Sequence, residues 1–174
     1  VPTLYRVHGL PEIDRLETLR TFMREFGIWL PAPDEITPEH LRDLLQKIGD
    51  RPDAGLISTA VIRSMPQAVY QPGNIGHFGL AFDFYTHFTS PIRRYPDLVI
   101  HRLVKAHAGG TPITTPEMQA FDKLALHASE REVAASDAER DSIKMKQVEF
   151  LSERIGEEFD AVISGVTERG LYVE

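Results

Sequence analysis

The stretch "HFTSPIRRYPDLVIHRLVK", residues 87–105, places a dense block of positive charge directly behind a rigid Ser-Pro turn. Residues 87–107 contain one acid, Asp97, and four basic residues, so the segment carries four minus one, or +3: Arg93, Arg94, Arg102 and Lys105. The whole chain of 174 residues carries −7. A polyanion would therefore have to bind at this local patch, since the remaining surface repels it.

Arg93 and Arg94 lie between two prolines, which restrict the backbone and lower the entropy lost when a guanidinium is held in place. An arginine presented in this way can bind a phosphate through two parallel hydrogen bonds. The neighbouring aromatic residues are Phe84, Tyr85, Phe88 and Tyr95. Arginines beside aromatic rings are typical of channels for single-stranded nucleic acid.

The pattern also has a structural interpretation. The two arginines could pair with acids on neighbouring helices, and the aromatic side chains could belong to the core. Because the arginines are adjacent, one of them must point away from any common site. Asp97, at the start of the following helix, is expected to act as a cap that complements the positive end of that helix.

The amino-acid composition limits the class of protein to which the chain can belong. Hydrophobic residues make up 42% of the chain and charged residues 26%, as in ordinary soluble domains. The chain has no cysteine, which agrees with a reducing compartment. No apolar run approaches the roughly 20 residues of a membrane span. The first residues, "VPTLYRVHGLPE", read like a cut through a longer polypeptide.

Apolar spacing predicts three helices in the first third of the chain, at 11–26, 38–48 and 53–65. Thr37 should cap the second helix, with Pro38 at its first position. Pro66 should end the third. The expected buried positions are Ile13, Leu16, Leu19, Phe22, Met23 and Phe26, then Leu41, Leu44, Leu45 and Ile48, then Leu56, Ile57, Ala60 and Val61.

The middle of the chain has a different pattern. Residues 77–85, "HFGLAFDFY", alternate and predict a strand with Phe78, Leu80, Phe82 and Phe84 on one face. A helix is expected over 96–107, and Thr115-Pro116 should begin another. Ser129 and Glu132 form a capping-box pattern, which predicts a further helix to about residue 155.

The last residues, "FDAVISGVTERGLYVE", predict two short strands around a Glu-Arg-Gly turn. A lone hairpin is barely stable in water, so it should pack on the helices or begin a further domain. Its exposed edges could also associate with another chain.

The quoted stretch, extended to "GHFGLAFDFYTHFTSPIRRYPDLVIHR", resembles the end of the catalytic domain of the ribonuclease II/ribonuclease R family of exoribonucleases. The segments "IRSMPQAVYQP" and 128–174 resemble the same family. The resemblance covers nearly the whole chain and is weak over residues 11–50. It implies an α+β fold, mainly helical with one or two core strands. Residues 1–156 would be the C-terminal part of the RNB-type catalytic domain, and 157–174 the first hairpin of an OB-fold RNA-binding domain.

The resemblance also implies an activity: processive hydrolysis of RNA from the 3′ end to 5′-monophosphates, in the cytoplasm. Arg93 falls where the family has an arginine that binds phosphate beside the scissile bond. Glu139 matches a glutamate that contacts the 3′-terminal nucleotide, although it could equally pair with Arg140 or Lys144 on the helix surface. Further candidate RNA contacts are Arg94, Arg102, Thr89, Ser90 and His77.

The family's chemistry uses Mg²⁺ held by clustered aspartates, and these precede the region that this chain resembles. Asp137 and Asp141, or Asp50 and Asp53, do not resemble such a cluster, and a solvated surface explains them better. We therefore expect no metal ligands in this chain and no hydrolysis by it alone. Two alternatives remain: a non-catalytic module that binds single-stranded RNA, and a helical interaction domain whose arginines are structural.

Overall fold

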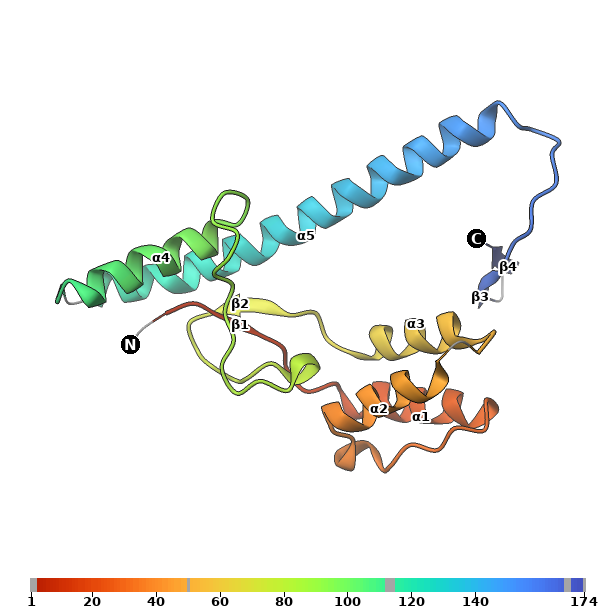
Figure 1. The fold of residues 1–174 in the computed structure, drawn as a ribbon, viewed down its shortest axis with the longest axis horizontal. Coiled ribbons are helices and arrows are strands. Elements are labelled where there is room, and N and C mark those ends of the chain that lie inside the picture. The colour runs from red at the N-terminus through yellow and green to blue at the C-terminus, as the bar shows by residue number, and fades with distance from the viewer. Residues whose placement is uncertain (1–2, 50, 112–114, 168–169, 174) are drawn as a thin grey trace. The chain divides into compact units, whose positions relative to one another are not determined.

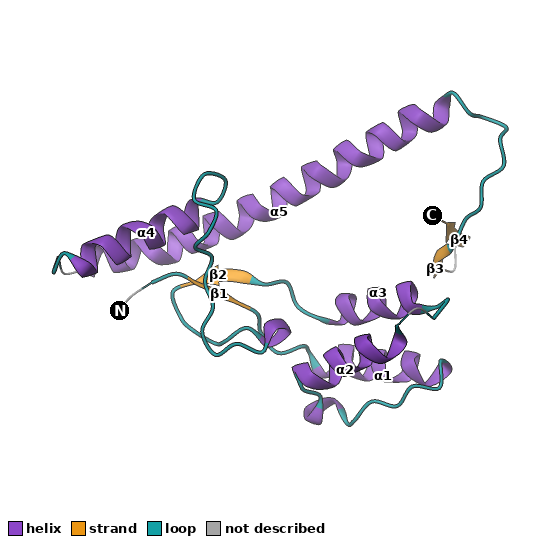
Figure 2. Cartoon of the chain, viewed as in Figure 1, coloured by secondary structure: helices purple, strands orange, loops and turns teal. Residues whose placement is uncertain are grey.

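The computed structural model describes residues 3–49, 51–111, 115–167 and 170–173. The chain divides into two compact units, Val1–Arg131 and Glu132–Glu174. The described elements are mainly helical, with two separate two-stranded sheets (Figures 1 and 2). The predicted α+β, mainly helical class is confirmed. The predicted boundary at residue 156 separates the catalytic domain from the OB-fold domain of the family, and the division into compact units does not test it. It stays a prediction.

Three helices form the first core of the N-terminal unit: α1 (Ile13–Glu25), α2 (Pro38–Ile48) and α3 (Ala54–Ser64), with the 3₁₀ turn η1 (Pro33–Glu35) between the first two. The buried side chains of this core, two of them from the segment between α1 and α2, are Leu16, Leu19, Met23, Leu30, Ile36, Leu41, Leu44, Ile48, Ile57 and Val61. The apolar spacing predicted these helices correctly. It overestimated the width of the buried stripe, because Ile13, Leu45 and Leu56 are exposed.

The boundaries of α2 and α3 follow the local chemistry expected from the sequence. The Thr37 hydroxyl accepts the His40 backbone N–H at 3.4 Å, and the Thr37 N–H donates to His40 Nδ1 at 3.1 Å. This reciprocal pair satisfies two donors at the helix start. Helix α3 ends at Ser64, two residues before Pro66.

The second core of this unit joins strands, helices and the N-terminal residues. Strands β1 (Tyr5–Val7) and β2 (Val69–Gln71) pair antiparallel, with Arg6 opposite Tyr70. Helix α4 (Tyr95–Ala108) packs against the beginning of α5 (Thr115–Ser152), and the two run side by side in Figure 1. The buried side chains here are Leu4, Tyr70, Val99, Ile100, Phe121 and Ala125.

The predicted strand over residues 77–85 is wrong. The segment contains the 3₁₀ turn η2 (Phe78–Leu80) and then Ala81 in the left-handed conformation, at φ 55°. Leu80, Phe82 and Phe84 are exposed rather than lined up on a buried face. Beside this turn, the residue after β1 supplies backbone bonds: His8 donates its N–H to the Gly76 carbonyl at 3.1 Å, and its carbonyl accepts the Phe78 N–H at 2.9 Å.

The predicted helix start at Ser129 is also wrong, since α5 runs through it without a break. The Ser129 hydroxyl donates to the Ala125 carbonyl at 2.9 Å, as a serine inside a helix does. Its oxygen also accepts the Tyr70 backbone N–H at 2.9 Å. The serine therefore links β2 to α5 instead of capping a helix.

The C-terminal unit contains the second half of α5 and the hairpin of β3 (Ile163–Thr167) and β4 (Gly170–Val173). The strands pair antiparallel from Ile163 opposite Val173 to Thr167 opposite Gly170, with a register shift between Ile163 and Gly165. The predicted hairpin is confirmed, while the centre of its turn lies outside the described residues. No helix in the described part of the chain is long and apolar enough to cross a membrane.

Replacing Ser129 by alanine should destabilise the N-terminal unit by about 1–3 kcal/mol, because the Tyr70 N–H loses its acceptor. Urea denaturation measures this difference. Ser142→Ala, on an exposed part of the same helix, is the control and should change stability by less than about 0.5 kcal/mol. Equal effects of the two substitutions would contradict the bridging role.

Lowering the pH should decrease the stability of the N-terminal unit through His8. The His8 ring is buried, and its Nδ1 accepts the Gly79 N–H at 3.1 Å. Burial lowers the pKa of His8 below 6.5, more than its hydrogen bond to the Pro66 backbone raises it. The unfolded chain then binds the proton more readily than the folded one. Stability should be full above about pH 6.5 and decline as the pH falls below it.

The midpoint of urea denaturation, measured between pH 7.5 and 5.5, tests this expectation. His8→Asn should flatten the pH dependence, whereas His107→Gln, at an exposed position, should preserve it. A His8 variant with the pH dependence of the unmodified chain would show that other groups cause it.

Candidate functional site

The Ser-Pro segment forms a single tight turn before α4. The Ser90 carbonyl accepts the backbone N–H groups of both Arg93, at 3.2 Å, and Arg94, at 3.0 Å. Pro91 suits the second position of such a turn because its φ is already fixed. Pro96 lies in the first turn of α4, where a missing N–H costs nothing. The backbone around the two arginines is therefore fixed, as the two prolines predicted.

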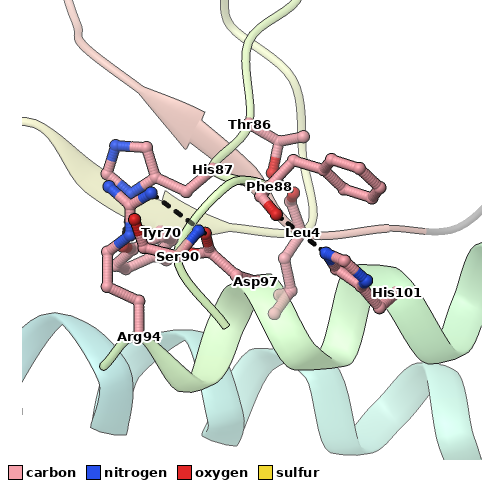
Figure 3. Close-up of polar contacts among 9 residues, drawn as sticks. All are labelled: Leu4, Tyr70, Thr86, His87, Phe88, Ser90, Arg94, Asp97 and His101. Atoms are coloured by element: carbon pink, nitrogen blue, oxygen red, sulfur yellow. Dashed lines mark hydrogen bonds and ion pairs between the residues drawn. The ribbon is translucent and has the colours of Figure 1, made fainter. Parts of the chain in front are cut away.

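Asp97 holds this turn against α4. Its side chain is completely buried, and Oδ2 accepts the Ser90 backbone N–H at 2.7 Å and Arg94 Nη2 at 2.9 Å (Figure 3). The expected cap of the helix is thus only partly correct. Asp97 lies in the first turn of α4, but the N–H that it binds belongs to the preceding turn.

The two adjacent arginines have different environments. Arg94 is half-buried and paired with Asp97, as the structural interpretation of the cluster expected. Arg93 is exposed, and among the described residues it forms no ion pair or side-chain hydrogen bond. Arg102, on α4, is likewise exposed and unpaired within that part of the chain. Whether Arg94 and Arg102 contact RNA stays a prediction.

The irregular segment that leads into the turn is attached to β1 and its neighbours. Arg6 donates its backbone N–H to the Tyr85 carbonyl at 2.9 Å. The Thr86 hydroxyl donates to the Leu4 carbonyl at 2.7 Å. These bonds connect residues about eighty positions apart, so no local pattern could have indicated them.

Two histidines extend these attachments. His87 Nδ1 forms a hydrogen bond with the Tyr70 hydroxyl at 2.7 Å. His101, on α4, donates from Nε2 to the Phe88 carbonyl at 2.8 Å, and its ring stacks on the Phe88 ring with 4.1 Å between centroids (Figure 3). Phe88 is held in place but remains 44% exposed, so it can still receive another planar group.

The sequence did not identify Asp97 and His101 as organisers of this site. The only available signal was sequence spacing: Asp97 lies seven residues after Ser90, and His101 lies thirteen residues after Phe88. Thr89 is exposed, and Ser90 contributes backbone bonds to the turn. Contacts of their hydroxyls with RNA stay predictions.

His77 lies elsewhere in the same irregular segment. Its ring stacks on His8 at 5.2 Å and meets Tyr85 edge to face at 5.2 Å. Burial and the nearby His8 lower the pKa of His77, which favours a neutral ring at pH 7. Together with His8, Phe82 and Asp83 it borders a shallow pocket of about 320 Å³. A contact with RNA at this position stays a prediction.

Glu139 lies on the part of α5 that belongs to the C-terminal unit, and its side chain is exposed. Arg140 bonds to Asp137 at 2.7 Å rather than to Glu139. Among the described residues Glu139 has no ion pair with Lys144 either. The suggested surface pair is therefore not formed.

No three histidine, aspartate or glutamate side chains gather as metal ligands within the described ranges. The Asp53 carboxylate forms an ion pair with Arg51 at 2.7 Å, and the Asp137 carboxylate forms one with Arg140. Asp50 lies outside the described residues. The expected lack of metal ligands in this chain stays a prediction.

Comparisons with known proteins agree with this geometry. The RNB domain family matches residues 1–110. The chain is 42% identical to ribonuclease R of Thermotoga maritima over all of its length and 25% of that protein. It is 40% identical to ribonuclease R of Escherichia coli over 99% of its length and 22% of that protein. The chain thus spans about a quarter of the length of these relatives.

Solved structures show the same relationship. Mycoplasma genitalium RNase R, in complex with ribose methylated single-stranded RNA, superposes with a TM-score of 0.90 at 30% identity, over 99% of this chain and 28% of that one. Yeast Ssd1, described as a pseudonuclease, superposes with a TM-score of 0.64 at 30% identity, over 72% of this chain and 16% of that one. With a family match over residues 1–110 and about 40% identity to ribonuclease R along its length, the chain belongs to the RNB family of ribonucleases.

Proposed function

We propose that this chain is the phosphate-binding and 3′-end-binding part of a processive 3′-to-5′ exoribonuclease that releases 5′-monophosphates. Its substrate is RNA entering with a single-stranded 3′ end, and the longer enzyme acts in the cytoplasm. The aspartates that hold Mg²⁺, which activates water for attack on phosphorus, lie outside this chain. The observation that carries the proposal is Arg93, which is exposed, has no side-chain partner among the described residues and lies on a turn whose backbone is fixed on both sides.

Arg93 can bind the phosphate beside the scissile bond through its planar set of donors. During hydrolysis negative charge grows on the phosphoryl oxygens, and a cation held in place before the reaction stabilises that charge without reorganising. The tight turn holds the Arg93 backbone, so less entropy is lost when the side chain engages RNA. Arg102, also exposed, would add a second phosphate contact along the strand.

The aromatic side chains around the turn supply stacking surfaces. Phe84, Phe88 and Tyr95 are 72%, 44% and 54% exposed. Stacking on such rings is worth about 1–3 kcal/mol per base and depends little on sequence. A strand bound by phosphate contacts and stacking could advance without base-specific contacts, as a processive enzyme requires.

Glu139 would contact the terminal ribose of the 3′ nucleotide, where a carboxylate can accept hydrogen bonds from the hydroxyl groups. Its exposed and unpaired state within the described residues leaves both oxygens accessible. Thr89, Ser90 and His77 would make subsidiary contacts, and the C-terminal hairpin would open an OB-fold that binds RNA.

A non-catalytic RNA-binding module is the second candidate. It is favoured by the resemblance to yeast Ssd1, a pseudonuclease with a related fold. Phosphate binding by arginine serves binding and catalysis alike, so RNA affinity by itself does not separate the two functions.

Arg93→Ala should weaken the binding of fluorescently labelled oligo(U) RNA by about tenfold to a hundredfold, because a charge-assisted hydrogen bond of about 1.5–3 kcal/mol is lost. The slope of log K against log salt should become shallower by about 0.7. Fluorescence anisotropy at several salt concentrations measures both quantities. Arg63→Ala, an exposed arginine on α3, controls for net charge and should have little effect.

The chain alone should leave 5′-labelled RNA uncut in Mg²⁺, and trimming to monophosphates would show that its metal site had been misplaced. A hybrid of E. coli ribonuclease R that carries these residues in place of its matching segment should trim RNA. In this hybrid, Arg93→Ala should slow single-turnover cleavage even at saturating RNA. Hybrids that bind RNA normally but never cleave it would favour the binding module.

A further inference from the structure

We propose that Asp97 is a positioning residue for RNA binding: its buried carboxylate fixes the turn over residues 90–94 so that Arg93 faces the RNA while Arg94 is withdrawn. The inference rests on the proposed function, because it assigns a task to a residue that does not itself touch RNA. It concerns residues of the N-terminal unit alone.

The geometry gives Asp97 control over the whole turn. A single carboxylate oxygen, Oδ2, accepts the Ser90 N–H at the beginning of the turn and Arg94 Nη2 at its end. The Ser90 carbonyl in turn accepts the N–H groups of Arg93 and Arg94. The backbone N–H of Arg93 is therefore one hydrogen-bonded step from the buried carboxylate. Ile92, beside it, is fully exposed, so the crest of the turn has no packing of its own to hold it.

Stability alone is a weak explanation for this arrangement. Asp97 Oδ1 and Arg94 Nε are buried without hydrogen-bond partners among the described residues. A buried ion pair with unsatisfied atoms often contributes no more stability than apolar side chains of similar size. In some proteins such a pair selects one geometry among several. Here the selected geometry separates two adjacent, chemically identical guanidinium groups.

Removing the charge of Asp97 has two possible effects on RNA affinity, and they act in opposite directions. By electrostatics alone, Asp97→Asn removes a negative charge and releases Arg94, so RNA should bind more tightly. If Asp97 positions Arg93, the loosened turn should weaken binding instead. The direction of the change therefore distinguishes the two effects.

The test is a double-mutant cycle, with anisotropy of labelled oligo(U) RNA as the readout. Asp97→Asn should weaken binding several-fold, and Asp97→Asn combined with Arg93→Ala should bind no more weakly than Arg93→Ala alone. Val99→Ala is the control, since Val99 is buried on the same helix in the apolar cluster with Leu4 and Phe121. Its effect should add to that of Arg93→Ala. Unchanged or tighter binding by Asp97→Asn, or additivity with Arg93→Ala, would overturn the proposal.

Backbone amide exchange measures the turn without RNA. In Asp97→Asn the amides of Ser90, Arg93 and Arg94 should exchange faster, while amides of α1 and α2 keep their protection. Exchange unchanged at the turn would also overturn the positioning role. If the unmodified chain fails to bind RNA, the proposed function fails, and the exchange result still decides whether Asp97 holds the turn.

Discussion

The irregular segment over residues 72–94 depends on satisfying its backbone polar groups without a regular sheet. A buried N–H or carbonyl without a partner costs about as much as a lost hydrogen bond, so every such group needs a specific acceptor or donor. Strand β1 and the following residue, His8, meet part of this need: Arg6 bonds to Tyr85, and the His8 backbone bonds to Gly76 and Phe78. The His8 ring accepts from Gly79, and the Asp97 carboxylate accepts from Ser90. Side chains thus perform here the role that neighbouring strands perform in a sheet.

The sequence-based predictions were correct where the stabilising contacts are local and wrong where the partners are distant in the sequence. Helices α1 to α4 were predictable because their apolar spacing, the Thr37 cap and the prolines are local signals. Residues 77–85 misled because their alternation imitates a strand, whereas the stabilising partners come from β1, about seventy residues earlier. Ser129 misled for a related reason. Its hydroxyl looked like a cap in sequence, but in the structure it accepts the N–H of Tyr70.

The candidate site shows the same limit at the level of single side chains. Composition and proline spacing indicated a fixed, basic turn with neighbouring aromatics, and the structure has these features. They also required one of the two arginines to point away, but nothing in "IRR" says which. That choice depends on Asp97, whose carboxylate pairs with Arg94 and, among the described residues, forms no ion pair with Arg93. Arg94 is three positions from Asp97 in the sequence and Arg93 is four positions from it. Sequence spacing therefore could not decide which arginine pairs with the carboxylate.

A chain of net charge −7 can present a site for RNA only if its acids are kept from opposing the local cations. Asp97 is the single acid in the basic segment, and its burial inside an ion pair removes most of its repulsion from the approaching strand. The cost is one cation, since Arg94 is used in neutralising it. Arg93 and Arg102 keep their charge at the surface, where phosphates can reach them. Family membership establishes the fold but does not establish catalysis, since a pseudonuclease shares that fold. Under the proposed function, the arrangement of these few charges determines how tightly the chain binds RNA.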